Sequence, residues 1–183
     1  MKSFFVGVLV VLGCLIVGGG ALVVSGGYNV AADVPHWKVT LLLLEAVKDR
    51  SIAVHSKGIT VPPLDEESLI QAGFPHFHGT CRLCHGGPGY PREEFAEGLY
   101  PEPPYLSSPD LQRELGDREL YWIVKNGLKM TGMPAFGKTH SEDQLWGIVA
   151  FLRRLPSLDE RTYEQMVETM SEGSARETEQ NEQ

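Results

Sequence analysis

The run Cys81-Arg82-Leu83-Cys84-His85 is the most informative part of this sequence, because it combines two thiols and an imidazole at fixed spacing. Thiols separated by two residues can form thioether bonds to one edge of a porphyrin, while the adjacent imidazole faces the iron at its centre. The run therefore predicts covalent attachment of one c-type haem, with Cys81 and Cys84 as tethers and His85 as an iron ligand.

Two other kinds of site use a Cys-x-x-Cys pair. A thioredoxin-like redox pair lies near a strand–helix–strand pattern, and no segment of this sequence alternates convincingly as a strand. A zinc site needs further ligands; the chain has no second cysteine pair, although His76 and His78 are close in sequence. Haem attachment fits better than either alternative.

For the iron of such a haem, ligation by two histidines is an alternative to ligation by one histidine and one methionine.

Met133, in the segment Thr131-Gly132-Met133-Pro134, is the predicted second iron ligand. A thioether is a soft, neutral ligand that raises the reduction potential of a haem whose other ligand is histidine. Pro134 restricts Met133 to an extended conformation, which helps to hold the sulfur in place. Met130 is the alternative ligand, but no proline follows it, and buried methionines most often only pack.

Residues 4–24 form an uncharged apolar segment at the N-terminus. A helix of this length spans roughly 31 Å, which matches a bilayer core. With Lys2 on the short leading side, we expect residues 1–27 to be a transmembrane signal-anchor in a bacterial inner membrane, with the haem domain on the periplasmic side. Cleavage after Ala32 and lipidation of Cys14 are the alternatives, and the length of the apolar run argues against both.

Length and charge limit the remaining possibilities. A chain of 183 residues is long enough for one core of ordinary size. Its net charge is -8, and residues 157–183 account for -6 of it, with eight carboxylates against two arginines. Nucleic acid is excluded as a partner, because phosphate binding needs a clustered basic face.

The sequence predicts an all-α fold with an exported linker at residues 28–67, a haem domain at 68–156 and an acidic tail at 157–183. The linker contains one amphipathic helix at residues 36–50. Its apolar side is expected to pack on its own domain, with the bilayer surface and a partner subunit as alternatives.

Capping residues mark where the helices of the exported part are expected to begin. Asp65, Asp117 and Ser141 each precede an apolar helical pattern and are predicted to cap it. Ser157 to Glu160 reads as a capping box that opens a short helix in the tail. Beyond Ser171 the chain is polar and acidic, which predicts disorder.

Over residues 68–156 the sequence resembles the class I cytochrome c family. Family members are similar in placing a glycine eight residues and an aromatic four residues before the first haem cysteine, where Gly73 and Phe77 stand here. The resemblance implies that both residues cross a C-terminal helix at Phe151, in a helical domain that wraps around one covalent haem.

The same resemblance implies roles for residues beyond the cysteines. A family proline followed two residues later by leucine is similar to Pro104-Tyr105-Leu106, which implies that the Pro104 carbonyl accepts the His85 Nδ1 proton and that Leu106 touches the haem. Pro101 and Pro103 are nearby alternatives. Trp122 is expected either beside a haem propionate or as ordinary core.

The predicted function is that of a membrane-anchored monohaem cytochrome, which transfers single electrons between respiratory-chain or dehydrogenase partners. Such a carrier is not an enzyme and requires no small-molecule substrate, because the haem itself is oxidised and reduced. A fixed subunit of a larger oxidase or dehydrogenase complex is the first alternative. A haem peroxidase or gas sensor is the second, and it would need an open sixth coordination site.

Overall fold

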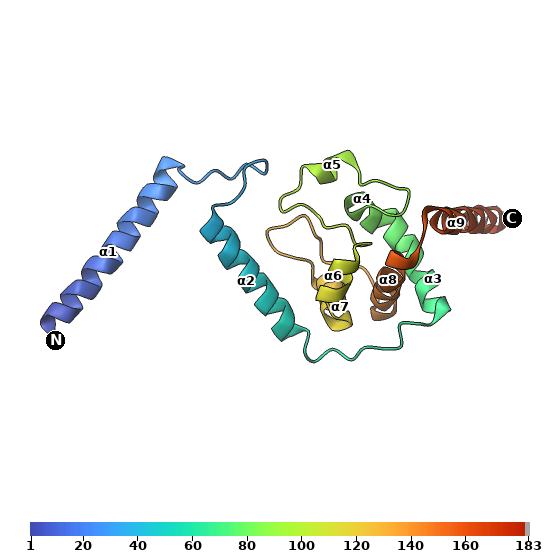
Figure 1. The fold of residues 1–183 in the computed structure, drawn as a ribbon, viewed down its shortest axis with the longest axis horizontal. Coiled ribbons are helices and arrows are strands. Elements are labelled where there is room, and N and C mark those ends of the chain that lie inside the picture. Colours follow the sequence, from blue (N-terminus) through green and yellow to red (C-terminus); the bar gives the residue numbers. More distant parts are fainter. Residues whose placement is uncertain (182–183) are drawn as a thin grey trace. The chain divides into compact units, whose positions relative to one another are not determined.

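The computed structural model describes residues 1–181 (Figure 1). The described residues contain helices and loops but no β-strand, which confirms the predicted all-α fold. In chain order the elements are α1 (Lys2–Ser25), α2 (Lys38–His55), α3 (Glu67–His76), η1 (Phe77–Cys81), α4 (Arg82–His85), α5 (Glu94–Glu97), α6 (Pro109–Glu114), α7 (Asp117–Asn126), η2 (Phe136–Lys138), α8 (Glu142–Arg154), η3 (Leu155–Ser157) and α9 (Glu160–Asn181).

Two compact units divide the chain, one ending at Pro35 and one beginning at His36. The first contains α1, the predicted apolar helix, which has 24 residues and an 18-residue window with a mean hydropathy of 2.6. By length and composition α1 can therefore cross a membrane. The second unit contains α2 to α9.

The centre of the second unit is a close crossing of α3 and α8. A Cβ atom on Gly73 would lie 2.0 Å from the carbonyl oxygen of Gly147, so the helices meet backbone to backbone. Beside the crossing, the Phe77 and Phe151 rings are fully buried, with centroids 5.0 Å apart. The predicted crossing of Gly73 and Phe77 with Phe151 is confirmed.

The apolar core extends from this crossing to α7 and α9. Tyr121 of α7 stacks on Trp146 of α8 with ring centroids 4.1 Å apart. The α8 helix begins as predicted, since the Ser141 hydroxyl accepts a hydrogen bond from the Gln144 backbone N–H. The buried apolar side chains around these contacts are Ile70, Phe74, Phe77, Leu120, Val124, Leu145, Ile148, Val149, Phe151, Leu155 and Tyr163.

Two of the predicted helix caps are wrong. Glu66, not Asp65, is the N-cap residue of α3, because the extended segment continues one residue further, and no side chain caps this end. Gly116 is the N-cap of α7, where the Glu119 carboxylate accepts a hydrogen bond from its backbone N–H at 2.8 Å. Asp117 is the first helical residue instead.

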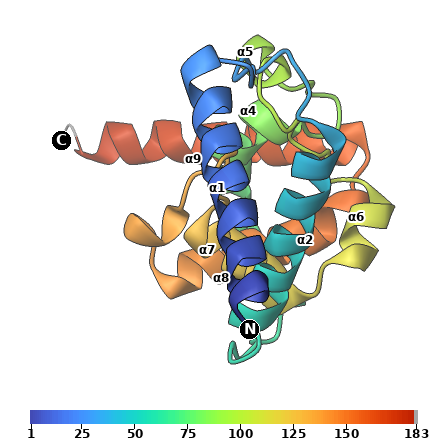
Figure 2. The ribbon, with the colours of Figure 1, turned by 90° about the vertical axis from the view of Figure 1, so that its left-hand side faces the viewer.

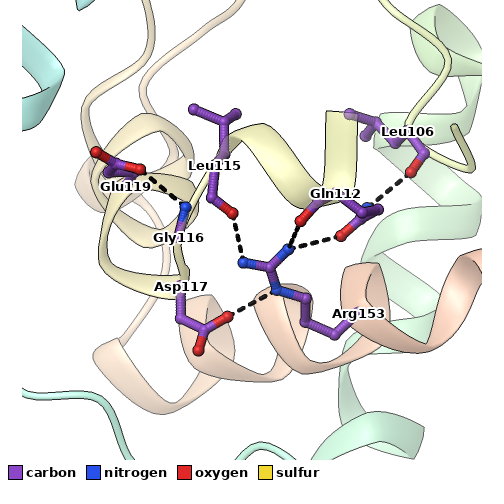
Figure 3. A network of polar contacts seen from close by, with 7 residues as sticks. All are labelled: Leu106, Gln112, Leu115, Gly116, Asp117, Glu119 and Arg153. Atoms are coloured by element: carbon purple, nitrogen blue, oxygen red, sulfur yellow. Dashed lines mark hydrogen bonds and ion pairs between the residues drawn. The ribbon is translucent and has the colours of Figure 1, made fainter. Parts of the chain in front are cut away.

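The Asp117 carboxylate is held by Arg153 of α8, whose guanidinium joins three segments (Figure 3). Arg153 donates to Asp117 at 2.7 Å, to the Leu115 carbonyl at 2.6 Å, and to both oxygens of Gln112 at 2.7 and 2.9 Å. Gln112 in turn donates to the Leu106 carbonyl at 2.8 Å. One side chain therefore fixes the start of α7, all of α6 and the loop that carries Leu106.

Replacing Arg153 with leucine is expected to lower the free energy of unfolding by about 2–4 kcal/mol, because several charge-assisted hydrogen bonds are lost together. Arg154→Leu is the matched control, since its side chain is more exposed and makes one ion pair, with Glu67 at 3.1 Å. Urea unfolding in mild detergent measures both variants. Equal effects would contradict a special role for Arg153.

The acidic tail differs from its prediction. Asp159, not Ser157, caps α9, with its carboxylate accepting from the Thr162 N–H at 2.7 Å. Helix α9 continues to Asn181, so the segment beyond Ser171 for which disorder was predicted is helical in the structure, with residues 182–183 outside the described part. Residues with good helix propensity and ion pairs four residues apart favour this continuation.

Tyr163 makes the first turns of α9 part of the core. Its side chain is fully buried and its ring lies 5.4 Å from that of Phe74. The His78 Nδ1 lies 3.0 Å from the Tyr163 hydroxyl. Burial holds the pKa of Tyr163 well above its usual value. The α9 face that packs is therefore the one that begins at Tyr163.

Candidate functional site

The Cys-x-x-Cys-His run lies where α3 passes through the π-helical turn η1 into α4. Cys81 ends η1, and Cys84 and His85 lie in the single turn of α4. Both thiols are half-buried and neither forms a disulfide. Residues three apart in helical backbone share one side, so both sulfur atoms are available to the same ligand.

The environment of the thiols argues against the zinc and redox alternatives. Burial raises the pKa of the Cys81 thiol to about 12, and burial also raises that of Cys84. Dithiol redox chemistry needs a thiolate, which these raised pKa values disfavour. Among the described side chains, no group of three or more His, Cys, Asp or Glu could hold a metal ion.

The His85 ring is oriented by the loop before α6. Its Nδ1 lies 2.7 Å from the Pro104 carbonyl oxygen, which confirms the predicted bond and selects Pro104 over Pro101 and Pro103. A carbonyl oxygen only accepts, so Nδ1 carries the proton and the lone pair is on Nε2. Burial lowers the pKa of His85, and the Arg92 charge lowers it further, which favours the neutral ring that a metal requires.

Hydrogen bonds to Thr131 and Leu128 fix the backbone of Met133 in its loop. Its N–H donates to the Thr131 hydroxyl at 3.1 Å, and that hydroxyl donates to the Leu128 carbonyl at 2.8 Å. Leu128 returns a hydrogen bond from its N–H to the Met133 carbonyl at 3.2 Å. Met133 is half-buried, whereas the alternative ligand Met130 is 73% exposed with a φ of 62°. The loop therefore favours Met133 over Met130.

The other predicted contacts are brought into the same domain. Leu106 is partly buried and packs against the apolar core. Trp122 of α7 is half-buried, with its ring 5.9 Å from the His55 ring. The roles of both residues toward a haem stay predictions.

The remaining histidines near the motif have protein partners. His78 pairs with Tyr163, and the His76 Nδ1 lies 3.3 Å from the His140 Nε2. In His76 and His78 these contacts use Nδ1 and leave Nε2, as at His85.

Arg92 is a buried charge that the sequence did not single out. Its side chain is 5% exposed, lies 4.0 Å from the centre of the Tyr105 ring, and forms an ion pair with Glu102 at 2.5 Å. No described residue accepts a hydrogen bond from its Nε, which is fully buried. A buried guanidinium N–H needs an acceptor.

Haem fits the surroundings of this orphaned atom. Arg92 is close enough to shift the pKa values of Cys84 and His85. Haem carries two propionate carboxylates, and a carboxylate is the preferred partner of a guanidinium. The donor set and the orphaned Nε therefore both suit haem c.

The match to a known family covers the part of the chain that contains these residues. Residues 68–152 match the family described as cytochrome C oxidase, cbb3-type, subunit III. No curated protein matches the chain. The matched segment extends from α3 to α8 and includes the Cys-x-x-Cys-His run, Pro104 and Met133. The match supports a class I c-type cytochrome domain over residues 68–152, and members of this family hold haem c and transfer electrons.

Proposed function

We propose that this protein is a membrane-anchored monohaem cytochrome that passes single electrons between redox protein partners at the outer face of a bacterial cytoplasmic membrane. Cys81 and Cys84 tether one haem, and His85 and Met133 ligate its iron. The 2.7 Å contact between the His85 Nδ1 and the Pro104 carbonyl carries the proposal, since it leaves Nε2 for the iron. Helix α1 supplies the anchor, with its N-terminus in the cytoplasm.

Bound haem supplies the one-electron chemistry, as its iron changes between the ferrous and ferric states. Pro104 holds the His85 ring in one tautomer, and Thr131 holds the backbone at Met133. Ligands fixed by the protein in both oxidation states keep rearrangement small. A closed coordination sphere has no place for a substrate, which favours a carrier over a peroxidase or gas sensor.

Replacing Met133 with alanine is expected to abolish the long-wavelength absorption band of sulfur-to-iron bonding in the oxidised protein. The reduction potential should fall by an amount on the order of 0.1 V, and the reduced form should bind carbon monoxide. Met130→Ala is the matched control and should leave the spectrum, the potential and the lack of carbon monoxide binding unchanged. Loss of the band in Met130→Ala alone would contradict the assigned ligand.

Replacing Arg92 with glutamine is expected to lower the reduction potential by an amount on the order of 50 mV, because a buried positive charge opposes the ferric state. Arg92→Lys, which keeps the charge, should retain most of the potential. Arg118→Gln removes an exposed charge and serves as the control. Potentiometric titration measures all three. An unchanged potential in Arg92→Gln would exclude a contact of Arg92 with the haem.

A fixed subunit of an oxidase is the second candidate, favoured by the family description, which names a subunit of a cbb3-type oxidase. Both candidates use the same haem chemistry and differ in their permanent contacts. Extraction in mild detergent followed by sizing separates them. A free carrier elutes as a lone small particle, whereas a subunit elutes with its complex.

A further inference from the structure

The first half of α2 presents an apolar stripe that its own domain does not cover. Positions four residues apart lie on one side of a helix, and a residue three positions away flanks them. The side chains that form this stripe have exposed fractions of 59–73%, well above those of a packed helix face. Its members are Val39, Leu42, Leu43 and Val47.

Helix α2 is attached to the domain through a different side: Leu44 is half-buried, and before the helix the His36 N–H donates to the Tyr100 hydroxyl at 3.2 Å. Ile52 is 5% exposed and Ser56, directly after the helix, is 3% exposed. The His55 ring lies 5.9 Å from that of Trp122 in α7. The prediction that the apolar side of residues 36–50 packs on its own domain therefore holds only in part, since Leu44 is half-buried while the stripe is exposed.

We propose that the stripe of α2 lies in the surface of the lipid bilayer, as an interfacial helix. The segment between Ser25, the end of α1, and Lys38, the start of α2, can span at most about 45 Å. A stripe on so short a tether stays near the bilayer surface. The inference rests on the proposed role of α1 as the anchor.

The charge of α2 also supports contact of the stripe with a lipid surface. The side chains of α2 include Lys38, Lys48 and Arg50 against two carboxylates, Glu45 and Asp49, so the helix is slightly basic. Anionic headgroups attract basic side chains next to a membrane. Arg50 continues the stripe by one turn, and its long stem lets the guanidinium reach the headgroups while the stripe inserts.

Helix α9, which contains most of the acidic residues of the tail, lies across the domain from α2. In Figure 1 α9 extends from the side opposite to α2, and Figure 2, viewed from the side of α2, has α9 behind the domain. An anionic surface repels this acidic segment and attracts α2, so both effects favour one orientation. The haem domain would then meet its redox partners in a fixed pose.

A spin label on the stripe tests the inference in the full-length holoprotein, where the haem thioethers protect Cys81 and Cys84. Cys14→Ser removes the remaining thiol, and Leu43→Cys supplies the labelling site. The labelled protein is placed in nanodiscs that contain phosphatidylglycerol. Dissolved oxygen concentrates in lipid and a nickel complex in water, so the ratio of their collision rates with the label measures its depth.

The Leu43 label should have an oxygen-to-nickel ratio about tenfold above that of a label at Gln165→Cys on α9, since an interfacial helix buries its apolar face in the acyl boundary. Lys48→Cys, on another side of α2, is the control within the helix and should have a ratio closer to that of Gln165. Replacing phosphatidylglycerol with phosphatidylcholine should lower the Leu43 ratio.

Two outcomes would overturn the inference. If the Leu43 label is as accessible to nickel as the Gln165 label, the stripe lies in water. If the Leu43 label is shielded from both oxygen and nickel, a second copy or another protein covers the stripe. The same sample also tests the proposed anchoring of the chain by α1. A chain that leaves the nanodisc contradicts the proposed anchoring by α1, whereas a chain that stays with an aqueous Leu43 label contradicts only the inference about α2.

Discussion

Replacement of Gly73 with alanine is expected to lower the free energy of unfolding by about 3 kcal/mol, at the upper end of the cost of overpacking a core. The new Cβ would lie 2.0 Å from the oxygen and 2.4 Å from the carbon of the Gly147 carbonyl, and 2.9 Å from the Ile148 nitrogen. All three are backbone atoms of α8, so no rotamer change relieves the clash. The helices must separate, which loosens the packing of Phe77 on Phe151.

A graded set of alanine variants checks this expectation by urea unfolding in mild detergent. The Cβ of Gly147→Ala would meet its nearest atoms at 3.3 Å, which predicts a smaller loss than at Gly73. Gly58→Ala meets nothing within 4 Å and has no positive φ, so its stability should stay within about 0.5 kcal/mol of the original. Equal stability of the Gly73 and Gly58 variants would show that α3 and α8 do not cross closely.

The α3–α8 crossing was predictable because its signals are local and specific. Gly73 and Phe77 stand at fixed distances before Cys81, and a clear apolar pattern precedes Phe151. Ser141 was also predictable, since its hydroxyl finds its partner, Gln144, within one turn. A feature whose partners lie within a few residues can be inferred from the order of residues alone.

The missed start of α7 has a partner that is distant in sequence. Asp117 has the composition of a helix cap, but its carboxylate binds Arg153, which lies 36 residues away. Glu119 takes over the capping of the helix. Only the folded chain determines which carboxylate reaches the free N–H. The capping residues in the sequence therefore predict that a helix is present, but they do not determine its first residue.

The same limit applies to the site. His85 and its bond to Pro104 followed from the motif and the family resemblance, whereas Arg92 carried no signal in a proline-rich loop. Its burial depends on Tyr105, which lies 13 residues later in the loop. The role of Tyr163 was missed because this residue stands in a polar segment. In the structure its single aromatic side chain is enough to bury one turn of α9.

Replacement of Gly127 with alanine is expected to detach Met133, the proposed second ligand, from the iron while the proposed ligand His85 stays bound. Gly127 ends α7 with φ 66° and ψ -174°, a conformation that is essentially restricted to glycine. A Cβ there would also lie 2.7 Å from the Met133 carbonyl oxygen and 2.7 Å from the Pro134 carbonyl carbon. Strain and clash both push the Met133 segment away from α7, and an iron–sulfur bond does not tolerate such a displacement.

The long-wavelength band of the oxidised Gly127→Ala protein should weaken or disappear, and its reduction potential should fall by an amount on the order of 0.1 V. The reduced protein should then bind carbon monoxide at the position vacated by Met133. Gly132→Ala is the matched control in the same loop, because its Cβ meets only the Leu99 side chain, at 2.9 Å, which can rotate away. If both variants lose the band equally, general loop packing rather than the conformation of Gly127 holds the sulfur on the iron.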